Sequence, residues 1–520
     1  MGHGNKSLLL VMAFLALVPH LLFLFQPAFI DERPIVSAHI DFVDQGTLIP
    51  GFAQYPSFSL YLTFPGSLVG IVVQHLWWGT GSLTDTTVWL LATQAVGLMF
   101  GGRVIVLACL CGAALLTWRA MGPGGPLAAV LVLATPGFLQ YGSYLLPDVP
   151  LFLLAMIVML SAMRAVEQGS ARWLYIAAAT AGLAASTKYN GASLVLVVAT
   201  AGVLLHGRDL LALLRSAGIC AVICLLAFLI GSPGWIFATD VFWGALQFEL
   251  AHSREGHLGT HGVPGFGQME LLLRNFPVLT IGGIIGAVFG SRAADPKTVL
   301  AVVTLLSGFA IASMTEKQSL HYLFVAMPAL VYFTAKAVDW SGAKARPGWF
   351  AAVGAVLVIS TVMALPMMRT SSTDLAREWL DRNVTKDQTI LRASAYVPDL
   401  RSATEFAEMA EQSEFTQAAA VLAQAQPTLN VAKYEYATGL AGLARADFLV
   451  TSAQVFDRYF EHGVFTSLPP GPEDALYTEF NRRRAFYAAL FQSKDWQIVF
   501  EADTGHGPRT LVFGRPQAGK

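Results

Sequence analysis

An acidic pair, Asp31-Glu32, stands where the first long apolar segment of the chain ends. Residues 8–30 contain no acid or base except His20, and a segment of this length can cross the hydrocarbon core of a membrane, which needs about 20 apolar residues. The two carboxylates therefore lie where the chain leaves a bilayer. A carboxylate next to an apolar wall binds protons more readily, which suits a general base. The alternative is that the pair only marks the solvated end of the first helix.

Other residues able to do chemistry lie in later breaks between apolar segments. They are Asp44 and Tyr55 in the first loop, Asp148 and Lys188 at two later breaks, Arg254 and His257 in a long loop, and Lys317, His321 and Tyr322 in the last outer break. Ionisable residues near a membrane are costly, and they usually pair with one another or serve a function. We therefore expect these side chains to gather in one pocket at the membrane boundary.

Each of these residues also has a purely structural interpretation. Asp148 could cap the helix that follows it, and Lys188 could be a lysine at a helix end whose ammonium reaches the headgroups. Lys317 and His321 could be interface anchors, and His257 an ordinary loop residue. A metal site stays open and unassigned, because Asp31, Asp148 and His257 could meet around a divalent cation such as Mg²⁺ or Mn²⁺, but no spacing fixes such a site.

The composition indicates a membrane protein with some soluble mass attached. Of the 520 residues, 55% are hydrophobic and only 13% are charged, whereas a soluble domain has about 25% charged residues. The net charge of −1 gives no overall field that would attract nucleic acid, so we expect no nucleic-acid partner. The four cysteines all lie inside apolar segments and cannot form a secreted disulfide framework.

The apolar segments predict a polytopic α-helical protein with about thirteen transmembrane helices. The expected crossings are 8–30, 56–77, 86–101, 104–118, 127–146, 149–163, 173–187, 190–205, 216–235, 272–290, 298–314, 320–335 and 347–366. With the N-terminus in the cytoplasm, the inner loops hold the bases Arg119, Arg164, Arg172, Arg208, Arg215, Arg292, Lys297, Lys336, Lys344 and Arg346. This is the pattern of the positive-inside rule, although the inner loop 78–85 has no Lys or Arg.

The composition changes after Pro366, where charged and mixed sequence begins. The pattern predicts helices over 375–382 and 482–492 and short strands over 389–393, 448–451, 496–501 and 510–513. We therefore expect a transmembrane domain over 1–369, with outer loops 31–55, 137–148 and 236–271, and a soluble α/β domain over 370–520. An odd number of crossings places the second domain outside the cytoplasm of a cell-membrane protein.

Five short motifs on the expected outer face follow one another in an order that is typical of one family. They are Asp31-Glu32-Arg33 with Tyr55-Pro56, Tyr144-Leu145-Leu146-Pro147-Asp148-Val149-Pro150, Ser186-Thr187-Lys188-Tyr189-Asn190-Gly191, the segment Glu249 to Gly259 with its Gly256-His257-x-Gly259, and Lys317-x-x-x-His321-Tyr322-Leu323 with Pro328. Each motif is weak alone, but together they resemble the membrane glycosyltransferases of the C-type fold. The resemblance is to the branch of the protein O-mannosyltransferases and the lipid A aminoarabinose transferase, and it covers residues 8–366 in order.

The resemblance implies an enzyme that moves a single sugar from a polyprenyl-phosphate donor in the membrane lipid to an acceptor hydroxyl on the extracytoplasmic face, with inversion. It implies Asp31 as general base, with Glu32 in the same catalytic pair. The donor phosphate would meet Lys188, Lys317, His321 and Tyr322, because negative charge grows on the leaving phosphate in the transition state. The sugar, the acceptor or a cation would meet Asp148, Asp44, Tyr55, His257 and Arg254.

The sequence departs from the family at two points, and these limit which residue roles and which acceptor the resemblance implies for this chain. The aminoarabinose branch has a lysine before its Pro-Pro, where this chain reads Gln54-Tyr55-Pro56-Ser57, so the cation on the phosphate must be Lys188, Lys317 or Arg254. The soluble tail is not the β-trefoil of the eukaryotic protein mannosyltransferases, so the acceptor could be a lipid, a glycan or a protein.

Two other functions fit the same sequence. A transporter or flippase of lipid-linked sugars would place ionisable groups near the membrane midplane and often shows inverted repeats, whereas here most charges lie at one boundary. A polysaccharide ligase or polymerase would use a diphosphate-linked oligosaccharide in place of a monophosphate-linked single sugar.

Overall fold

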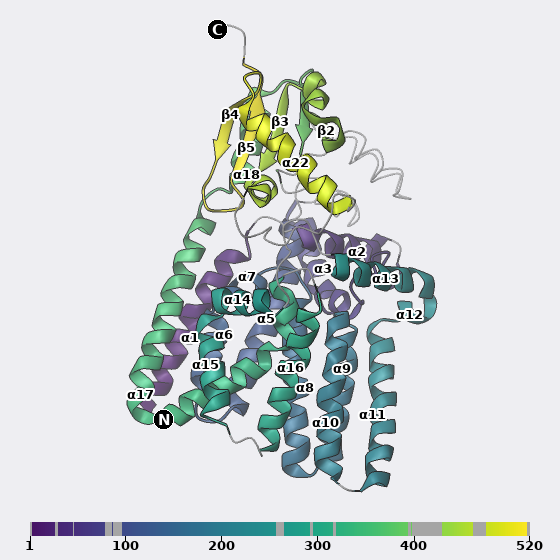
Figure 1. Ribbon diagram of the computed structural model, residues 1–520, viewed down its shortest axis with the longest axis vertical. Helices are drawn as coiled ribbons and strands as arrows, with labels where there is room; N and C mark the ends of the chain where they lie inside the picture. Colours follow the sequence, from purple (N-terminus) through teal and green to yellow (C-terminus); the bar gives the residue numbers. More distant parts are fainter. Residues whose placement is uncertain are drawn as a thin grey trace.

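The computed structural model describes residues 3–26, 30–44, 46–78, 86, 96–207, 209–255, 265–291, 295–315, 319–393, 397, 429–460 and 475–516. A bundle of helices forms the larger part of the molecule, and a small mixed sheet with its helices lies at one end (Figure 1). The N-terminal end of the first helix lies at the opposite end of the bundle from this sheet. The predicted fold class, an α-helical membrane protein with a C-terminal α/β domain, is confirmed.

The helices of the bundle follow the apolar segments of the sequence. They are α1 (His3–Phe23), α3 (Phe58–Trp78), α5 (Val96–Ala120), α6 (Gly125–Ala134), α7 (Pro136–Tyr141), α8 (Asp148–Gln168), α9 (Ala171–Ala185), α10 (Val195–His206), α11 (Leu210–Gly231), α15 (Pro277–Val288), α16 (Pro296–Ser313) and α17 (Met327–Ala364). Among the described residues, seven helices are long and apolar enough to cross a membrane, or eight if one bent pair counts as a single span. The predicted number of crossings therefore stays a prediction.

Helix ends are set by familiar local signals. Asp209 and Asp295 cap α11 and α16 through side-chain bonds to backbone N–H groups, which would otherwise lack partners. Proline occupies the first turn of α15 and α16, where its missing N–H costs nothing. Gly169 ends α8 in the left-handed conformation that favours glycine.

The helices differ from the sequence-based expectation in several places. The expected break between residues 101 and 104 is absent, because α5 runs unbroken from Val96 to Ala120. The expected crossing 272–290 is instead a pair, α14 (Phe266–Asn275) and α15, bent by 114° at Pro277. α17 joins two expected crossings across Gly342, whose φ of 70° separates two arms, and the second arm rises to the C-terminal domain (Figure 1).

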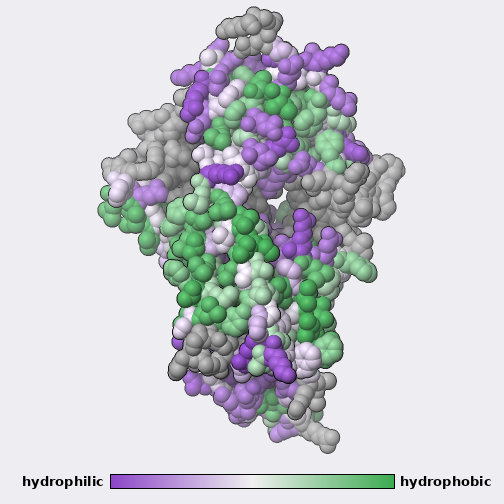
Figure 2. Space-filling view, turned by 90° about the vertical axis from the view of Figure 1, so that its left-hand side faces the viewer, coloured by the Kyte–Doolittle hydropathy of each residue, from purple (hydrophilic) through white to green (hydrophobic). Residues whose placement is uncertain are grey.

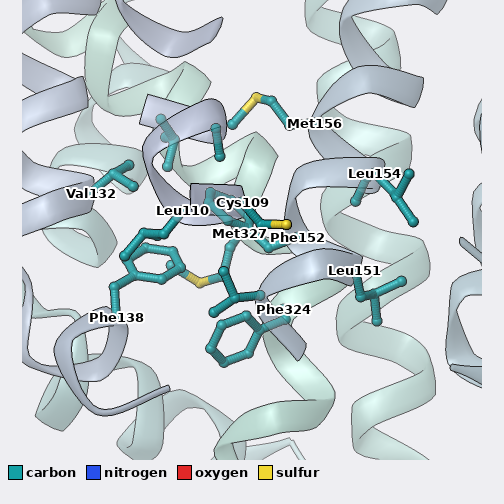
Figure 3. Packing of buried hydrophobic residues seen from close by; sticks show 14 of the residues in the cluster. Cys109, Leu110, Val132, Phe138, Leu151, Phe152, Leu154, Met156, Phe324 and Met327 are labelled. Carbon is teal, nitrogen blue, oxygen red and sulfur yellow. The ribbon is translucent and has the colours of Figure 1, made fainter. Parts of the chain in front are cut away.

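α8 is the centre of the bundle and is the most completely buried of the long apolar helices. Figure 3 shows its Leu151, Phe152, Leu154 and Met156 packed among apolar side chains of α5, α6, α7 and α17. The ring of Phe138 on α7 lies 4.7 Å from that of Phe152 and 5.7 Å from that of Phe324 in η3 (Leu320–Val325), measured between centroids. This packing fixes η3 against the N-terminal half of α8.

Several shorter helices connect the long helices towards the end of the bundle that faces the sheet. They are η1 (Ile30–Glu32), α2 (Arg33–Asp44), η2 (Tyr189–Leu194), α12 (Gly234–Phe237), α13 (Thr239–Glu255) and α14. α2 and α13 cross the same end of the bundle (Figure 1). In Figure 2, hydrophobic side chains cover the middle of the bundle, while hydrophilic ones gather on the C-terminal domain and at the far end. This distribution is the one expected of a protein held in a bilayer.

The C-terminal domain is built on a five-stranded sheet with the strand order β2-β1-β3-β5-β4. Its elements are α18 (Ser372–Asn383), β1 (Thr389–Arg392), β2 (Asn430–Lys433), η5 (Tyr436–Arg445), β3 (Phe448–Ser452), α21 (Ala453–Phe456), η6 (Asp457–Tyr459), α22 (Ala475–Gln492), β4 (Gln497–Ala502) and β5 (Thr510–Gly514). β1 pairs in parallel with β2 and β3, whereas β5 is antiparallel to β3 and β4. The four expected strands are present, and β2 is an addition.

The domain is fastened to the end of the bundle at the turn between β4 and β5. After α17, the chain forms η4 (Leu365–Met368) and enters α18. The Ser372 N–H donates to the His506 carbonyl oxygen at 2.8 Å, and the His506 imidazole donates from Nδ1 to the Arg369 carbonyl oxygen at 2.6 Å. The Ser372 hydroxyl also accepts a bond from the Thr504 N–H. The sheet is therefore held to the last membrane helix at a second point besides the connecting chain.

A prediction concerns the close contact between α3 and α5. A Cβ on Gly101 would collide with the carbonyl oxygen of Gly66, so Gly101→Ala must push two helix backbones apart. We expect a loss of about 1–3 kcal/mol of stability, as for other overpacked sites, seen as a lower melting temperature of the purified protein in detergent.

Gly218→Ala on α11 is the matched control. A Cβ on Gly218 would meet nothing within 4 Å, and alanine favours the helix by about 1 kcal/mol over glycine. This variant should melt no earlier than the unmodified chain. Equal melting temperatures for both variants would contradict the close α3–α5 contact.

Candidate functional site

Two of the predicted site residues form a buried ion pair at the sheet-facing end of the bundle. Lys188 follows α9 and precedes η2, and its Nζ lies 2.8 Å from Oδ1 of Asp148, the first residue of α8. Both side chains are buried. The N-terminus of α8 carries a partial positive charge that also favours the Asp148 carboxylate. Residues 40 positions apart in the sequence are thus brought together at the point where the expected pocket lies.

Two tyrosine rings enclose the Lys188 ammonium. The Nζ atom lies 5.6 Å from the ring centroid of Tyr55, in the loop before α3, and 5.4 Å from that of Tyr322 in η3. Aromatic faces attract a cation at this distance. The first loop, the α9–η2 break and the α16–α17 connection therefore meet around one positive charge.

Asp31 faces the same group of side chains. It is partly exposed in η1, and its carboxylate interacts electrostatically with Asp148, Tyr55 and Tyr322. Burial raises the pKa of the Tyr55 phenol well above its usual value, and the nearby carboxylates of Asp31, Asp148 and Glu249 raise it further. Tyr55 is therefore neutral at physiological pH and keeps its proton as a hydrogen-bond donor.

Glu32, the neighbour of Asp31, points into the bundle instead. Its carboxylate forms a two-pronged ion pair with Arg103 of α5, with Nε–Oε1 and Nη2–Oε2 distances of 2.8 and 2.7 Å, and both side chains are 0% exposed. Oε1 of Glu32 also accepts a bond from the Leu145 N–H at 2.7 Å. Arg103 Nη1 donates to the carbonyl oxygens of Leu24 and Gln26. Glu32 thus ties the end of α1 to α5 and to the turn before Asp148.

Two hydrogen bonds from backbone N–H groups hold the loop that carries Tyr55 against the segments that follow α9 and α11. The Ser57 N–H donates to the Ser232 hydroxyl at 2.8 Å, and the Phe58 N–H donates to the Ser186 carbonyl oxygen at 2.9 Å. These contacts hold the start of α3 against the ends of α9 and α11. The position of the Tyr55 ring over Lys188 is therefore set by backbone as well as by its own packing.

α13 contributes a carboxylate that was absent from the predicted site. Glu249 interacts electrostatically with Tyr55 and Tyr322, and the Ser253 side chain on the next turn bonds to Tyr322. The sequence places Glu249 in the long loop 236–271, but only the position of α13 across the end of the bundle brings it to the site. Arg103 was missed as well, because it falls in an expected break between two helices, whereas it lies inside the unbroken α5.

His321 lies at the edge of this group. Its ring centroid is 4.4 Å from that of Tyr322 and 6.5 Å from that of Tyr141 on α7, and its Nδ1 lies 3.0 Å from the Ser319 hydroxyl oxygen. Lys317 and His257 lie outside the described residues, as do the side chains of Asp44 and Arg254. Within the described part of the chain, no group of three His, Cys, Asp or Glu residues is placed to hold a metal ion.

A prediction follows from the Glu32–Arg103 pair. Glu32→Gln leaves the Arg103 guanidinium buried without a counter-charge, which costs about 3–5 kcal/mol at comparable sites. We expect a strongly lowered melting temperature in detergent. Glu167→Gln is the matched control, because it breaks an ion pair of similar length, 2.6 Å to Lys297, whose side chains are exposed. Such a pair contributes about 0–1 kcal/mol, and equal losses in the two variants would contradict a structural role for Glu32.

Comparison with known proteins points to one fold. Residues 90–237 match a family model described as dolichyl-phosphate-mannose-protein mannosyltransferase. No curated protein sequence matches the chain significantly. Among solved structures, ArnT from Cupriavidus metallidurans in the apo state is 14% identical with a TM-score of 0.50, over 98% of this chain and 98% of that chain.

Two further structures match less closely in shape. ArnT from Cupriavidus metallidurans bound to undecaprenyl phosphate is 15% identical over 100% of this chain and 99% of that chain, with a TM-score of 0.49. The archaeal oligosaccharyltransferase AglB from Archaeoglobus fulgidus, in complex with an inhibitory peptide and a dolichol-phosphate, is 10% identical over 96% of this chain and 80% of that chain, with a TM-score of 0.42. The chain therefore has the C-type fold of membrane glycosyltransferases, as its motif order predicts, and its segment 90–237 matches the mannosyltransferase family.

Proposed function

We propose that this protein transfers a single sugar from a polyprenyl-phosphate donor to an acceptor hydroxyl, at the end of the bundle that faces the sheet. The observation that carries the proposal is the convergence of Asp31, Asp148 and the tyrosines on the enclosed ammonium of Lys188. The matched family is named for a dolichyl-phosphate sugar, which supports a lipid-linked monophosphate donor. The site lies at the boundary where the phosphate of such a lipid would meet a polar pocket.

Asp31 is the proposed general base. It is more exposed than Glu32, whose carboxylate oxygens both accept hydrogen bonds from Arg103. In the proposed step, the acceptor oxygen forms a bond to the anomeric carbon, and its proton passes to Asp31. The bond between the anomeric carbon and the phosphate oxygen breaks, and the phosphate leaves with the electron pair. Attack opposite the leaving phosphate inverts the anomeric centre.

Lys188 is the proposed cation on the leaving phosphate. An ammonium has three N–H donors, and the bond to Asp148 uses one of them. The neutral Tyr55 and Tyr322 hydroxyls would add donors beside it without adding charge. Preorganised donors of this kind stabilise charge that develops in the transition state. Glu32 acts in this scheme as a positioning residue, because it fixes η1 and so the backbone beside Asp31.

The remaining predicted residues have roles that depend on the donor and acceptor. His321, which contacts Tyr322, and Lys317 would lie on the phosphate side. Asp44, Arg254 and His257 belong to the outer loops, where the sugar or the acceptor would bind. The C-terminal domain is fastened above this end of the bundle and is the proposed acceptor-side module.

The proposed orientation follows the positive-inside rule. The ends of α5, α8, α9 and α16 that carry Arg119, Arg164, Arg172 and Lys297 lie opposite the sheet (Figure 1). With these bases in the cytoplasm, the N-terminus is cytoplasmic, and the site and the C-terminal domain are extracytoplasmic.

The first functional prediction concerns Asp31→Asn. The purified protein is incubated with a panel of polyprenyl-phosphate sugars and candidate acceptors, and the release of polyprenyl phosphate is measured. Because general-base catalysis contributes about 10²- to 10⁴-fold, we expect kcat to fall by that amount while donor binding is kept. Asp240→Asn, which neutralises an exposed carboxylate on the same face, is the control. Undiminished turnover by the Asp31→Asn variant would exclude Asp31 as the base, and donor binding without any turnover by the unmodified protein would favour the transporter alternative.

The second functional prediction separates the structural role of Lys188 from its proposed catalytic one. Lys188→Gln leaves Asp148 buried without its partner, so both stability and transfer should fall. The double variant D148N/K188Q removes both charges, and its melting temperature should recover. Its turnover should stay about 10²- to 10³-fold below that of the unmodified chain, the usual loss for one transition-state donor. Recovery of both stability and turnover would show that Lys188 serves only to pair Asp148.

A further inference from the structure

A polar cavity lies at the end of the bundle opposite the candidate site. It has a volume of about 580 Å³ and is formed where α9, α10 and α11 end or begin. Its polar lining consists of Tyr175, His206, Asp209, Arg215 and Ser216. Ligand sites in proteins have volumes of about 300–1,000 Å³ and are marked by a few convergent polar groups. None of these residues takes part in the proposed transfer of a sugar.

Two polar atoms at this cavity lack the partners that burial demands. Ser216 is 4% exposed, and its hydroxyl has no oxygen or nitrogen partner among the described residues; its polar neighbour is the weak thiol of Cys220. Nε2 of His206 is likewise buried without a described partner. Leaving a buried polar atom without a partner is unfavourable, and a ligand with matching donors and acceptors would remove this cost.

The two charges that line the cavity have opposite signs. Asp209 caps α11, and its Oδ1 accepts the Ala212 N–H at 3.0 Å. Arg215 lies further along the same helix, and its side chain is exposed. A purely anionic ligand would be repelled by Asp209, and a purely cationic one by Arg215. A ligand that carries an anionic and a cationic group a few bonds apart complements both.

The surroundings of the cavity show where such a ligand would come from. Leu211 lines it and is 79% exposed, and Leu210 and Leu214 beside it are exposed as well. In a membrane protein, exposed leucines at the end of a long apolar helix contact lipid. The cavity therefore opens onto the headgroup layer, with acyl-chain space directly beside it.

We propose that this cavity binds the headgroup of a zwitterionic aminophospholipid. The phosphate lies against Arg215, with His206 and the Ser216 hydroxyl as donors, and the primary ammonium lies against Asp209. The acyl chains lie along the exposed leucines of α11. The proposal is independent of the sugar-transfer reaction and of which face is cytoplasmic, so its failure would leave the proposed function untouched.

The experiment uses the full-length protein in lipid nanodiscs that contain equal amounts of phosphatidylethanolamine, phosphatidylglycerol and phosphatidylcholine. After transfer to mild detergent, native mass spectrometry measures which lipids stay bound. Phosphatidylglycerol has no cationic group, and the quaternary ammonium of phosphatidylcholine has no N–H for Asp209. We expect phosphatidylethanolamine to be retained about two- to fivefold over the other two, as for a partly solvated ion pair.

Two variants assign the contacts. Asp209→Asn keeps the helix cap, because Asn caps as well as Asp, but it removes the negative charge, so the preference for phosphatidylethanolamine over phosphatidylglycerol should disappear. Arg215→Gln should lower the retention of both lipids. Arg119→Gln, which removes an exposed base at the same end of the bundle but away from the cavity, should leave the lipid pattern unchanged.

Three outcomes would overturn the proposal. The first is an unchanged lipid preference in Asp209→Asn. The second is an equal loss of retention in Arg215→Gln and Arg119→Gln, which would mean that Arg215 acts only as one of the bases that orient the protein in the membrane. The third is competition by soluble glycerophosphoethanolamine as effective as that by the lipid. That result would assign the cavity to a free phosphoester in place of a membrane lipid.

Discussion

Burial of charge inside an apolar bundle is the constraint on which the rest of this structure depends. An isolated carboxylate or guanidinium in such an interior is very unfavourable, so each such group needs a partner in the folded bundle. Glu32 and Arg103 pair across η1 and α5, and Asp148 and Lys188 pair across α8 and the α9–η2 break. The first pair also accepts the N–H of Leu145, three residues before Asp148. The two pairs therefore fix neighbouring parts of the same turn, and Asp31 is the residue directly before Glu32.

The two ion pairs differ in what surrounds them. Arg103 donates to two backbone carbonyl oxygens besides Glu32, and the pair is closed off from solvent. Lys188 is instead flanked by the faces of Tyr55 and Tyr322, and these two tyrosines interact electrostatically with further carboxylates. A guanidinium with planar donors suits a permanent structural link. A compact ammonium with one bond to Asp148 suits a place where an incoming anion must be bound and released.

The length and order of the apolar segments, and the turn signal at Asn190-Gly191, predict the helical class and the face on which Asp148 and Lys188 meet. They do so because membrane helices must be long, apolar and joined at polar breaks. Arg103, the partner of Glu32, could not be predicted from the sequence, because a single arginine inside an apolar segment indicates a break between two helices. Its compensating carboxylate lies 71 residues away. Glu249 was not assigned to the site, since only the path of α13 across the bundle brings it to Tyr55. β2 was missed because its sequence, Asn430-Val431-Ala432-Lys433, contains only one residue that favours strands.

The fastening of the C-terminal sheet has a mechanical consequence. A domain that is joined to a membrane helix only by the connecting chain can rotate freely about that connection. Here the turn at Thr504–His506 is bonded to residues 369–372, directly beside the point where the chain leaves α17. Two attachments so close together suppress rotation about the helix axis but still permit tilting about the line that joins them. The sheet is therefore restrained from rotating about the axis of the last membrane helix, and tilting is the motion that these hydrogen bonds leave open.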